Sequence, residues 1–120
     1  MSDSYKIYED DLFLCILDRN PIRQGHLLLI TKEHYPYIYQ LPIKVYKRIF
    51  LKVRELRLVL EKVYKANRIG MYVGGISVPH VHIHMVPIYK KKDFDPCLSK
   101  KMTEKELKNM QSQILKGINM

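Results

Sequence analysis

The chain has 120 residues, of which 47% are hydrophobic and 28% are charged. This length suits one domain with a single core, and the composition excludes an intrinsically disordered chain. The uninterrupted apolar stretches are too short to span a bilayer, and the acidic N-terminus is unlike a signal peptide. Cys15 and Cys97 lack the paired spacing of a disulfide framework or a cysteine zinc site. We therefore expect a cytoplasmic protein without membrane contact.

The net charge of +9 is unevenly distributed along the chain. Residues 1–41 carry four Lys or Arg against six Asp or Glu, residues 42–88 carry nine against two, and residues 89–120 carry eight against four. Such a basic surplus can attract polyphosphates, nucleic acid or an anionic membrane surface. We interpret it as the solvated face of a helix, together with the tail, and do not expect nucleic acid as a partner.

The first third of the chain is predicted to form three strands. Tyr5–Tyr8 and Leu12–Leu17 have strand-like composition and are separated by an acidic turn. A third strand, His26–Thr31, follows Gly25. Because the turns between these segments are short, we expect an antiparallel meander.

From Pro42 onward the hydrophobic period changes from two to between three and four residues. Apolar residues at this spacing define one stripe on a helix of about 25 residues; they are Tyr46, Ile49, Phe50, Val53, Leu56, Leu60, Val63 and Tyr64. Lysines and arginines occupy the remaining faces. Pro42 suits the first turn, where its missing N–H is not needed. The sequence therefore predicts one long, basic, amphipathic helix.

The second half of the chain is predicted to add two strands and a shorter helix. Ile69–Val73 and His80–Ile88 read as strands on either side of a glycine pair, and Pro79 favours an extended entry into the second. Thr103 followed by Glu106 is a capping-box pattern, which predicts a helix from there through Leu115, ending near residue 117.

Three of the five histidines, His80, His82 and His84, alternate along the last predicted strand, which puts them on one face. Two chemistries use such a row. Neutral imidazoles can bind a metal such as zinc, with an open position for water. Alternatively, one imidazole attacks phosphorus while its neighbours orient it and neutralise phosphate oxygens. A metal site would need a further ligand, for which His26 and His34 are the distant candidates.

Two quoted segments identify a family. "HVHIHMVP", residues 80–87, resembles the His-x-His-x-His-x-x signature of the histidine triad (HIT) superfamily of nucleotide hydrolases and transferases. "YEDDLFLCILDRNPIRQGHLLLITKEHY", residues 8–35, is similar to the segment of that family in which an Asp follows a strand and a Gly-His pair opens the next. The resemblance covers about residues 5–92 of a single domain, 1–120, and leaves 93–120 as a C-terminal helical tail. It implies an α+β fold, with a mainly antiparallel five-stranded sheet, one long and one shorter helix, and sheets joined across a homodimer.

The resemblance also implies catalytic roles for four histidines. His82 matches the nucleophile that attacks the α-phosphorus and forms a covalent nucleotidyl-histidine. His84 matches the histidine that contacts phosphate oxygens and helps the leaving group, and His80 helps to hold the tautomer of the nucleophile. His26 matches a fourth histidine packed beside the triad. A neutral imidazole suits nucleophilic attack when its other nitrogen is hydrogen-bonded.

Nucleotide binding is implied for a second group of residues. Asp18 matches the carboxylate that accepts hydrogen bonds from the ribose hydroxyls, and Leu17 precedes it. Ser77 stands where many members carry a hydroxyl near the phosphate, and Gly75 would let the backbone approach the phosphates. Ile76 replaces a residue that is often polar in the family, and the Asn usually found upstream of the triad is absent.

Three functions follow from these observations. The first is a hydrolase that splits purine nucleoside phosphoramidates or dinucleoside polyphosphates through His82, without a metal or cofactor. The second is a non-catalytic module that binds a purine nucleotide or a partner protein, which the changes near Ile76 would allow. The third is a metal-dependent hydrolase that uses the three alternating histidines as ligands.

Overall fold

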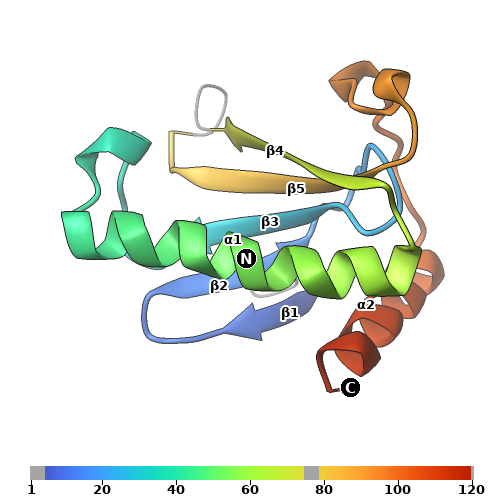
Figure 1. Cartoon of the computed structure of the whole chain (residues 1–120), viewed down its shortest axis with the longest axis horizontal. Helices are drawn as coiled ribbons and strands as arrows, with labels where there is room; N and C mark the ends of the chain where they lie inside the picture. The colour runs from blue at the N-terminus through green and yellow to red at the C-terminus, as the bar shows by residue number, and fades with distance from the viewer. Residues whose placement is uncertain (1–4, 75–78, 120) are drawn as a thin grey trace.

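Five antiparallel strands form one sheet in the order β1-β2-β3-β5-β4 (Figure 1). The protein is described by a computed structural model that covers residues 5–74 and 79–119. The strands are β1 (Lys6–Glu9), β2 (Phe13–Leu17), β3 (Leu27–Thr31), β4 (Arg68–Gly74) and β5 (His82–Ile88). The first three form the predicted meander, and the α+β class with a five-stranded antiparallel sheet is confirmed.

Two α-helices accompany the sheet. The long helix α1 (Ile43–Tyr64) lies across one face of the sheet, and α2 (Glu104–Ile118) packs against α1 and β1 (Figure 1). Pro42 is the N-cap of α1 rather than a residue of its first turn. Thr103 caps α2 in the predicted capping box with Glu106. Three short 3₁₀ helices were not predicted: η1 (Ile38–Gln40), η2 (Lys91–Asp93) and η3 (Pro96–Leu98).

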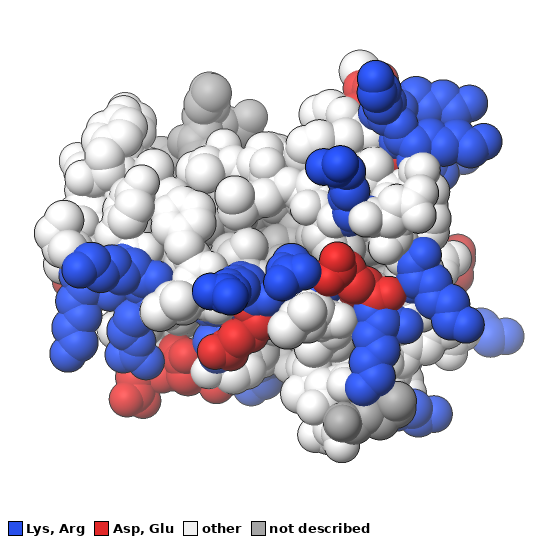
Figure 2. Space-filling view, viewed as in Figure 1, with Lys and Arg blue, Asp and Glu red and all other residues white. Residues whose placement is uncertain are grey.

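The basic residues of α1 lie on its solvent-facing side. Figure 2 shows Lys and Arg side chains along this helix, interrupted by acidic ones. Two pairs are ion pairs along the helix, with N–O distances of 2.7 Å for Lys52 and Glu55 and 2.8 Å for Arg57 and Glu61. This arrangement supports the interpretation of the charge as a solvated helix face. Among the described residues, no helix is both long and apolar enough to cross a membrane.

The hydrophobic core lies between α1 and the sheet. Alternate residues of the three central strands face it, each at most 1% exposed: Phe13, Cys15, Leu17, Leu27, Leu29, Ile83 and Met85. Helix α1 contributes Ile49, Leu56 and Leu60. Burial of each such side chain contributes roughly 1.5–3 kcal/mol. Cys15 is thus a free cysteine buried in this core.

The residues between these core positions face the other side of the sheet, here called the open face. Strand register aligns Leu28 with His84 and Ile30 with His82 across β3 and β5, and Tyr72 with His84 across β4 and β5. Because paired residues of antiparallel strands share a face, β5 presents His82 and His84 on the open face while Ile83 and Met85 enter the core. The sheet thus separates the core from the histidines.

The prediction that the last strand begins at His80 is wrong, although His80 lines the same groove of the open face as His82. Strand β5 begins at His82, two residues later than expected. The N–H of Val81 donates to the carbonyl oxygen of Tyr35 at 2.8 Å, and the ring of His80 bonds to Thr31. Residues 80 and 81 are therefore held by the segment after β3 and do not continue the ladder.

Candidate active site

The imidazole of His82 is fixed by a main-chain contact. Its Nδ1 lies 2.8 Å from the carbonyl oxygen of His80. Because a carbonyl oxygen can only accept, Nδ1 carries the proton, and the lone pair of a neutral ring is then on Nε2. This is the tautomer that a nucleophilic histidine needs.

Gly74 makes room for that imidazole. It pairs with His82 across β4 and β5, and a Cβ atom at position 74 would overlap the Nε2 atom and lie 2.8 Å from Cε1 of His82. Any side chain at this position would displace the ring, so the glycine is required by the close approach of His82.

A directed chain of hydrogen bonds determines the protons of His26 and His84. The main-chain N–H of Ile22 donates to Nδ1 of His26 at 3.0 Å, so the proton of His26 is on Nε2. That Nε2–H donates to Nδ1 of His84 at 2.9 Å. A neutral His84 therefore carries its own proton on Nε2, where it can be donated to a ligand.

Burial keeps both imidazoles neutral. Desolvation lowers the pKa of His84 to about 3, and repulsion from His26 and His82 acts in the same direction. Desolvation also lowers the pKa of His26, although the Asp18 carboxylate opposes it. Tyr72 stacks on His84 with ring centroids 4.0 Å apart and an angle of 8° between planes. Near neutral pH, His84 is thus an uncharged hydrogen-bond donor held between rings.

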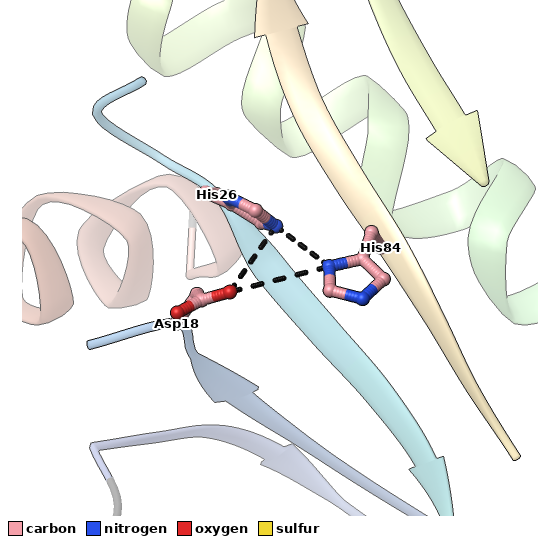
Figure 3. A group of neighbouring side chains, drawn as sticks. All are labelled: Asp18, His26 and His84. Atoms are coloured by element: carbon pink, nitrogen blue, oxygen red, sulfur yellow. Dashed lines mark hydrogen bonds and ion pairs between the residues drawn. The ribbon is translucent and has the colours of Figure 1, made fainter. Parts of the chain in front are cut away.

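Asp18 lies at the end of β2, beside this pair of histidines (Figure 3). One carboxylate oxygen, Oδ1, accepts from the main-chain N–H of Asn20 at 2.8 Å. The other, Oδ2, lies 3.5 Å from Nε2 of His26 and 4.0 Å from Nδ1 of His84. One oxygen therefore holds the turn after β2, while the other faces the site.

The ring of His80 makes its hydrogen bonds outside this cluster. Its Nε2–H donates to the carbonyl oxygen of Thr31 at 2.8 Å, and its Nδ1 lies 3.1 Å from Nδ1 of the exposed His34. The implied role of His80 in holding the tautomer of His82 thus fits its main-chain carbonyl, while its ring attaches residue 80 to Thr31.

The residues with metal-ligand geometry are not the three alternating histidines that the metal hypothesis proposed. Among the described residues, the His, Cys, Asp or Glu side chains whose donor atoms converge in a group of three are Asp18, His26 and His84. Their separations of 2.9, 3.5 and 4.0 Å are close to the edge of about 3.3 Å expected for a zinc tetrahedron.

The hydrogen bonds of His26 nevertheless oppose a metal at this position. Coordination through Nε2 would require the proton on Nδ1, where the N–H of Ile22 already points. The two N–H groups would then face each other at 3.0 Å. We therefore interpret the cluster as a set of hydrogen-bonded neutral imidazoles rather than as a metal site.

The predicted nucleotide-binding residues have different fates. The side chain of Leu17 is 1% exposed in the core and does not reach the open face, because it lies on the side of β2 that faces α1. Ser77, Gly75 and Ile76, the residue that departs from the family pattern, lie outside the described residues. Of this group, Asp18 is the one that the structure places beside the histidines.

Two cavities contain histidines of the candidate site in their lining. An apolar groove of about 440 Å³ lies on the open face and is lined by Leu14, Leu28, Ile30, Thr31, Lys32, His80 and His82. A smaller cavity of about 240 Å³, here called the Asp18 cavity, is lined by Asp18, Asn20, Ile22, His26, Tyr72, Pro96 and Ser99. The groove therefore reaches His82, and the Asp18 cavity reaches Asp18 and His26.

Sequence reasoning missed Tyr72 and Ile22, and it noted Gly74 only as part of a glycine pair. Tyr72 and Gly74 touch the histidines because β4 pairs with β5 in a particular register. Ile22 acts through its main-chain N–H, which no side-chain pattern reveals. The alternation Gly70, Tyr72, Gly74 was the available signal, since period two marks residues that share a face.

Comparisons with known proteins agree on one family. A family model for the HIT domain matches residues 1–91. Adenylylsulfatase HINT3 of Arabidopsis thaliana is 36% identical over 91 residues, which cover 72% of this chain and 46% of that protein. The asymmetrical bis(5'-nucleosyl)-tetraphosphatase of Schizosaccharomyces pombe is 35% identical over 96 residues, covering 76% and 52%. The chain spans about half the length of these two relatives.

A solved structure shows the same fold. The crystal structure of a hypothetical histidine triad nucleotide-binding protein from Sulfolobus tokodaii superposes with a TM-score of 0.85 at 25% identity, covering 98% of this chain and 85% of that one. The family match, the sequence relatives and the shared fold lead to one conclusion: the chain belongs to the histidine triad (HIT) family.

Proposed function

We propose that the protein is a hydrolase that splits purine nucleoside phosphoramidates or dinucleoside polyphosphates at the α-phosphorus, through a covalent nucleotidyl intermediate on His82. The observation that carries the proposal is the hydrogen bond from Nδ1 of His82 to the carbonyl oxygen of His80, which leaves Nε2 as the free nucleophile. The names of two relatives, an adenylylsulfatase and a tetraphosphatase, support hydrolysis at a nucleotide phosphate.

In the first step, Nε2 of His82 attacks the α-phosphorus. The new nitrogen–phosphorus bond forms as the bond to the leaving group breaks, and the leaving group departs with that electron pair. The imidazole of His82 becomes cationic while Nδ1 keeps its proton. The carbonyl oxygen of His80, 2.8 Å from Nδ1, then stabilises this charge.

His84 serves as a hydrogen-bond donor in this scheme. Its Nε2–H can stabilise negative charge on a phosphate oxygen or on the departing atom. It does not surrender that proton, because Nδ1 accepts a hydrogen bond from His26 and loss of the Nε2 proton would leave an imidazolate anion. The leaving group therefore takes its proton from water.

In the second step, water attacks the same phosphorus from the vacated side. The bond to His82 breaks, the ring regains its neutral form, and the proton of the water passes to solvent. The product is a nucleoside monophosphate, and the enzyme is unchanged.

In this proposal the apolar groove binds the base of the nucleoside, and the Asp18 cavity binds its sugar. The apolar groove beside His82, with Leu14, Leu28 and Ile30, suits a purine base. The carboxylate of Asp18 can accept hydrogen bonds from two neighbouring sugar hydroxyls, since among the described residues the neighbours of Oδ2 are the neutral His26 and His84. The α-phosphorus would then lie between the cavities, at His82 and His84.

One assay separates this proposal from its rivals. Turnover of a fluorogenic adenosine 5'-phosphoramidate is measured with and without a chelator, together with binding of adenosine monophosphate. We expect turnover that the chelator does not change. Binding without turnover would indicate a non-catalytic nucleotide-binding module. Turnover that is lost with the chelator and restored by zinc would indicate a metal-dependent hydrolase.

A further inference from the structure

The segment between β5 and α2, residues 89–103, is fastened to the loop that carries Asp18. We call it the connector. The N–H of Lys100 donates to the carbonyl oxygen of Pro21, and the N–H of Met102 donates to that of Arg19, both at 3.2 Å. In Figure 1 the connector descends beside the loop between β2 and β3. The connector therefore follows the rim of the candidate site.

A buried ion pair anchors the start of the connector to the same loop. The carboxylate of Asp93, 3% exposed, pairs with the guanidinium of Arg23. Its other oxygen accepts from the main-chain N–H groups of Tyr89 and Lys90, at 3.0 and 2.8 Å. Burial raises the pKa of Asp93, but these hydrogen bonds and Arg23 outweigh burial and lower it. The carboxylate is therefore charged at neutral pH and holds both segments.

Ring contacts join the connector to the triad. Phe94 packs on Tyr72 with centroids 5.4 Å apart, and Tyr72 stacks on His84 at 4.0 Å. Pro96, the first residue of η3, and Ser99, its C-cap, line the Asp18 cavity. The connector thus supplies one wall of the cavity whose opposite residues include Asp18 and His26.

We infer that Pro96 and Ser99 form the sugar-side wall of the nucleotide site and limit the groups that a bound nucleotide can carry on its ribose hydroxyls. This inference rests on the proposed placement of the sugar at Asp18. The Asp18 cavity of about 240 Å³ is smaller than the roughly 300–1,000 Å³ of pockets that hold a whole ligand. It therefore accommodates a ribose, and a large substituent on the ribose oxygens would meet the connector.

The family match supports a role in specificity rather than in the shared chemistry. It ends at residue 91, so both wall residues lie beyond it. The four histidines lie within it. The wall is thus a part of the site in which this chain can differ from its relatives while keeping the same reaction.

The test places a large side chain in the Asp18 cavity by substituting a residue of the connector. Ser99→Trp places a large side chain at an exposed position of the wall, and Ser112→Trp makes the same change at an exposed position of α2. We expect Ser99→Trp to raise KM for an adenosine 5'-phosphoramidate about tenfold or more, with kcat changed less than about threefold, because the substitution blocks binding rather than the chemical step. Ser112→Trp should match the wild type.

Binding of adenosine monophosphate is measured in parallel with turnover. The hydrolase proposal and the wall proposal can then be overturned independently. A wild type that binds adenosine monophosphate without turnover overturns the hydrolase, while weaker binding by Ser99→Trp still supports the wall. Normal turnover and unchanged KM in Ser99→Trp overturn the wall alone. A wild type that neither binds nor turns over overturns both.

A second measurement uses the wild type and does not depend on how a variant folds. Adenosine monophosphate is compared with its 2'(3')-O-(N-methylanthraniloyl) derivative by calorimetry. The added group should weaken binding at least about tenfold, which is about 1.4 kcal/mol. Equal affinity for the two nucleotides overturns the inference.

Discussion

The Nδ1 atom of His82 donates its proton to the main-chain carbonyl oxygen of His80 at 2.8 Å. The acceptor belongs to the backbone, so no side-chain substitution at position 80 removes it. The ring of His80 attaches residue 80 to Thr31 through its own hydrogen bond.

Substitutions at these two histidines should therefore differ in severity. His82→Asn keeps a hydrogen-bonding group but removes the nucleophile, so kcat should fall by several orders of magnitude. Affinity for adenosine monophosphate should change by less than about tenfold. His80→Asn should be milder, because the carbonyl remains. Single-turnover kinetics with calorimetry measures both, and near-normal turnover by His82→Asn would show that the nucleophile is misassigned.

Gly74→Ala should abolish turnover without unfolding the protein. The added methyl would overlap the ring of His82 and force it away from its position. Gly70→Ala, in the same strand, is the matched control, since its methyl would lie 3.2 Å from Ile88 and Phe94 and outside the triad. We expect kcat/KM to fall at least about a hundredfold in the first variant only. Comparable activity in the two variants contradicts the close approach at position 74.

The ring protons of the site histidines can be observed directly. We expect nitrogen-detected NMR spectra at neutral pH to show His82 protonated on Nδ1, and His26 and His84 protonated on Nε2, as their hydrogen bonds require. His26→Phe removes the donor to Nδ1 of His84, so the His84 signal should shift toward a mixture of tautomers. An Nδ1-protonated His84 in the wild type would contradict the directed chain.

Neutral burial of His84 should make folding stability depend on pH. Its pKa falls from 6.5 to about 3 on folding, so below pH 6.5 the unfolded chain binds a proton that the folded chain does not. Stability is therefore complete above pH 6.5 and is lost as the pH falls toward 3, by up to about 1.4 kcal/mol per pH unit.

Urea unfolding between pH 7.5 and 5.5 measures this slope. His84→Gln should reduce this slope, because it removes the buried imidazole. Identical slopes for the wild type and His84→Gln are incompatible with a neutral buried imidazole at position 84.

We expect two copies of the chain to form a homodimer through α1 and the edge strand β4. Leu51 and Leu58 of α1 are each 55% exposed, and Met71 and Val73 of β4 are 44% and 45% exposed. Register pairs both β4 residues with core-facing residues of β5, so they lie on the same side of the sheet as α1. Figure 2 shows a largely uncharged surface beside that helix. Two self-complementary apolar areas of this kind favour a symmetric dimer.

Light scattering tests the dimer. The mass should be twice the 14.3 kDa of one chain, and Val73→Glu should lower it at micromolar concentration. Ile118→Glu, at a 37% exposed position of α2, is the control and should remain dimeric. A wild type that has the mass of one chain at every concentration rules out this association.

The sequence pattern predicted the ends of the strands to within two residues. It succeeded because polar–apolar alternation and flanking Gly or Pro residues depend on neighbours in the sequence. It failed at the start of β5, where Val81 bonds to Tyr35, 46 positions earlier. A period of two cannot reveal that competing partner. The short 3₁₀ helices of the connector were missed for a similar reason, since they form against the loop at residues 19–23.

For the candidate site, family motifs located side chains but not their surroundings. His26, His84 and Asp18 come together as the resemblance implied. Tyr72 and Ile22 could not be found in that way, because one depends on strand register and the other contributes only a main-chain N–H. Leu17 was predicted to lie beside the nucleotide, but it faces the core. Neighbouring strand residues such as Ile16 and Leu17 face opposite sides of β2, and Leu17 is the one on the core side.

The alternation along β5 also constrains how this protein can vary. His82 and His84 serve the open face while Ile83 and Met85 fill the core, so inserting or deleting one residue ahead of them would exchange the two sets. Imidazoles would then enter a dry interior, and aliphatic side chains would replace them at the open face. Point changes can tune activity and folding separately, whereas a length change in this strand damages both at once.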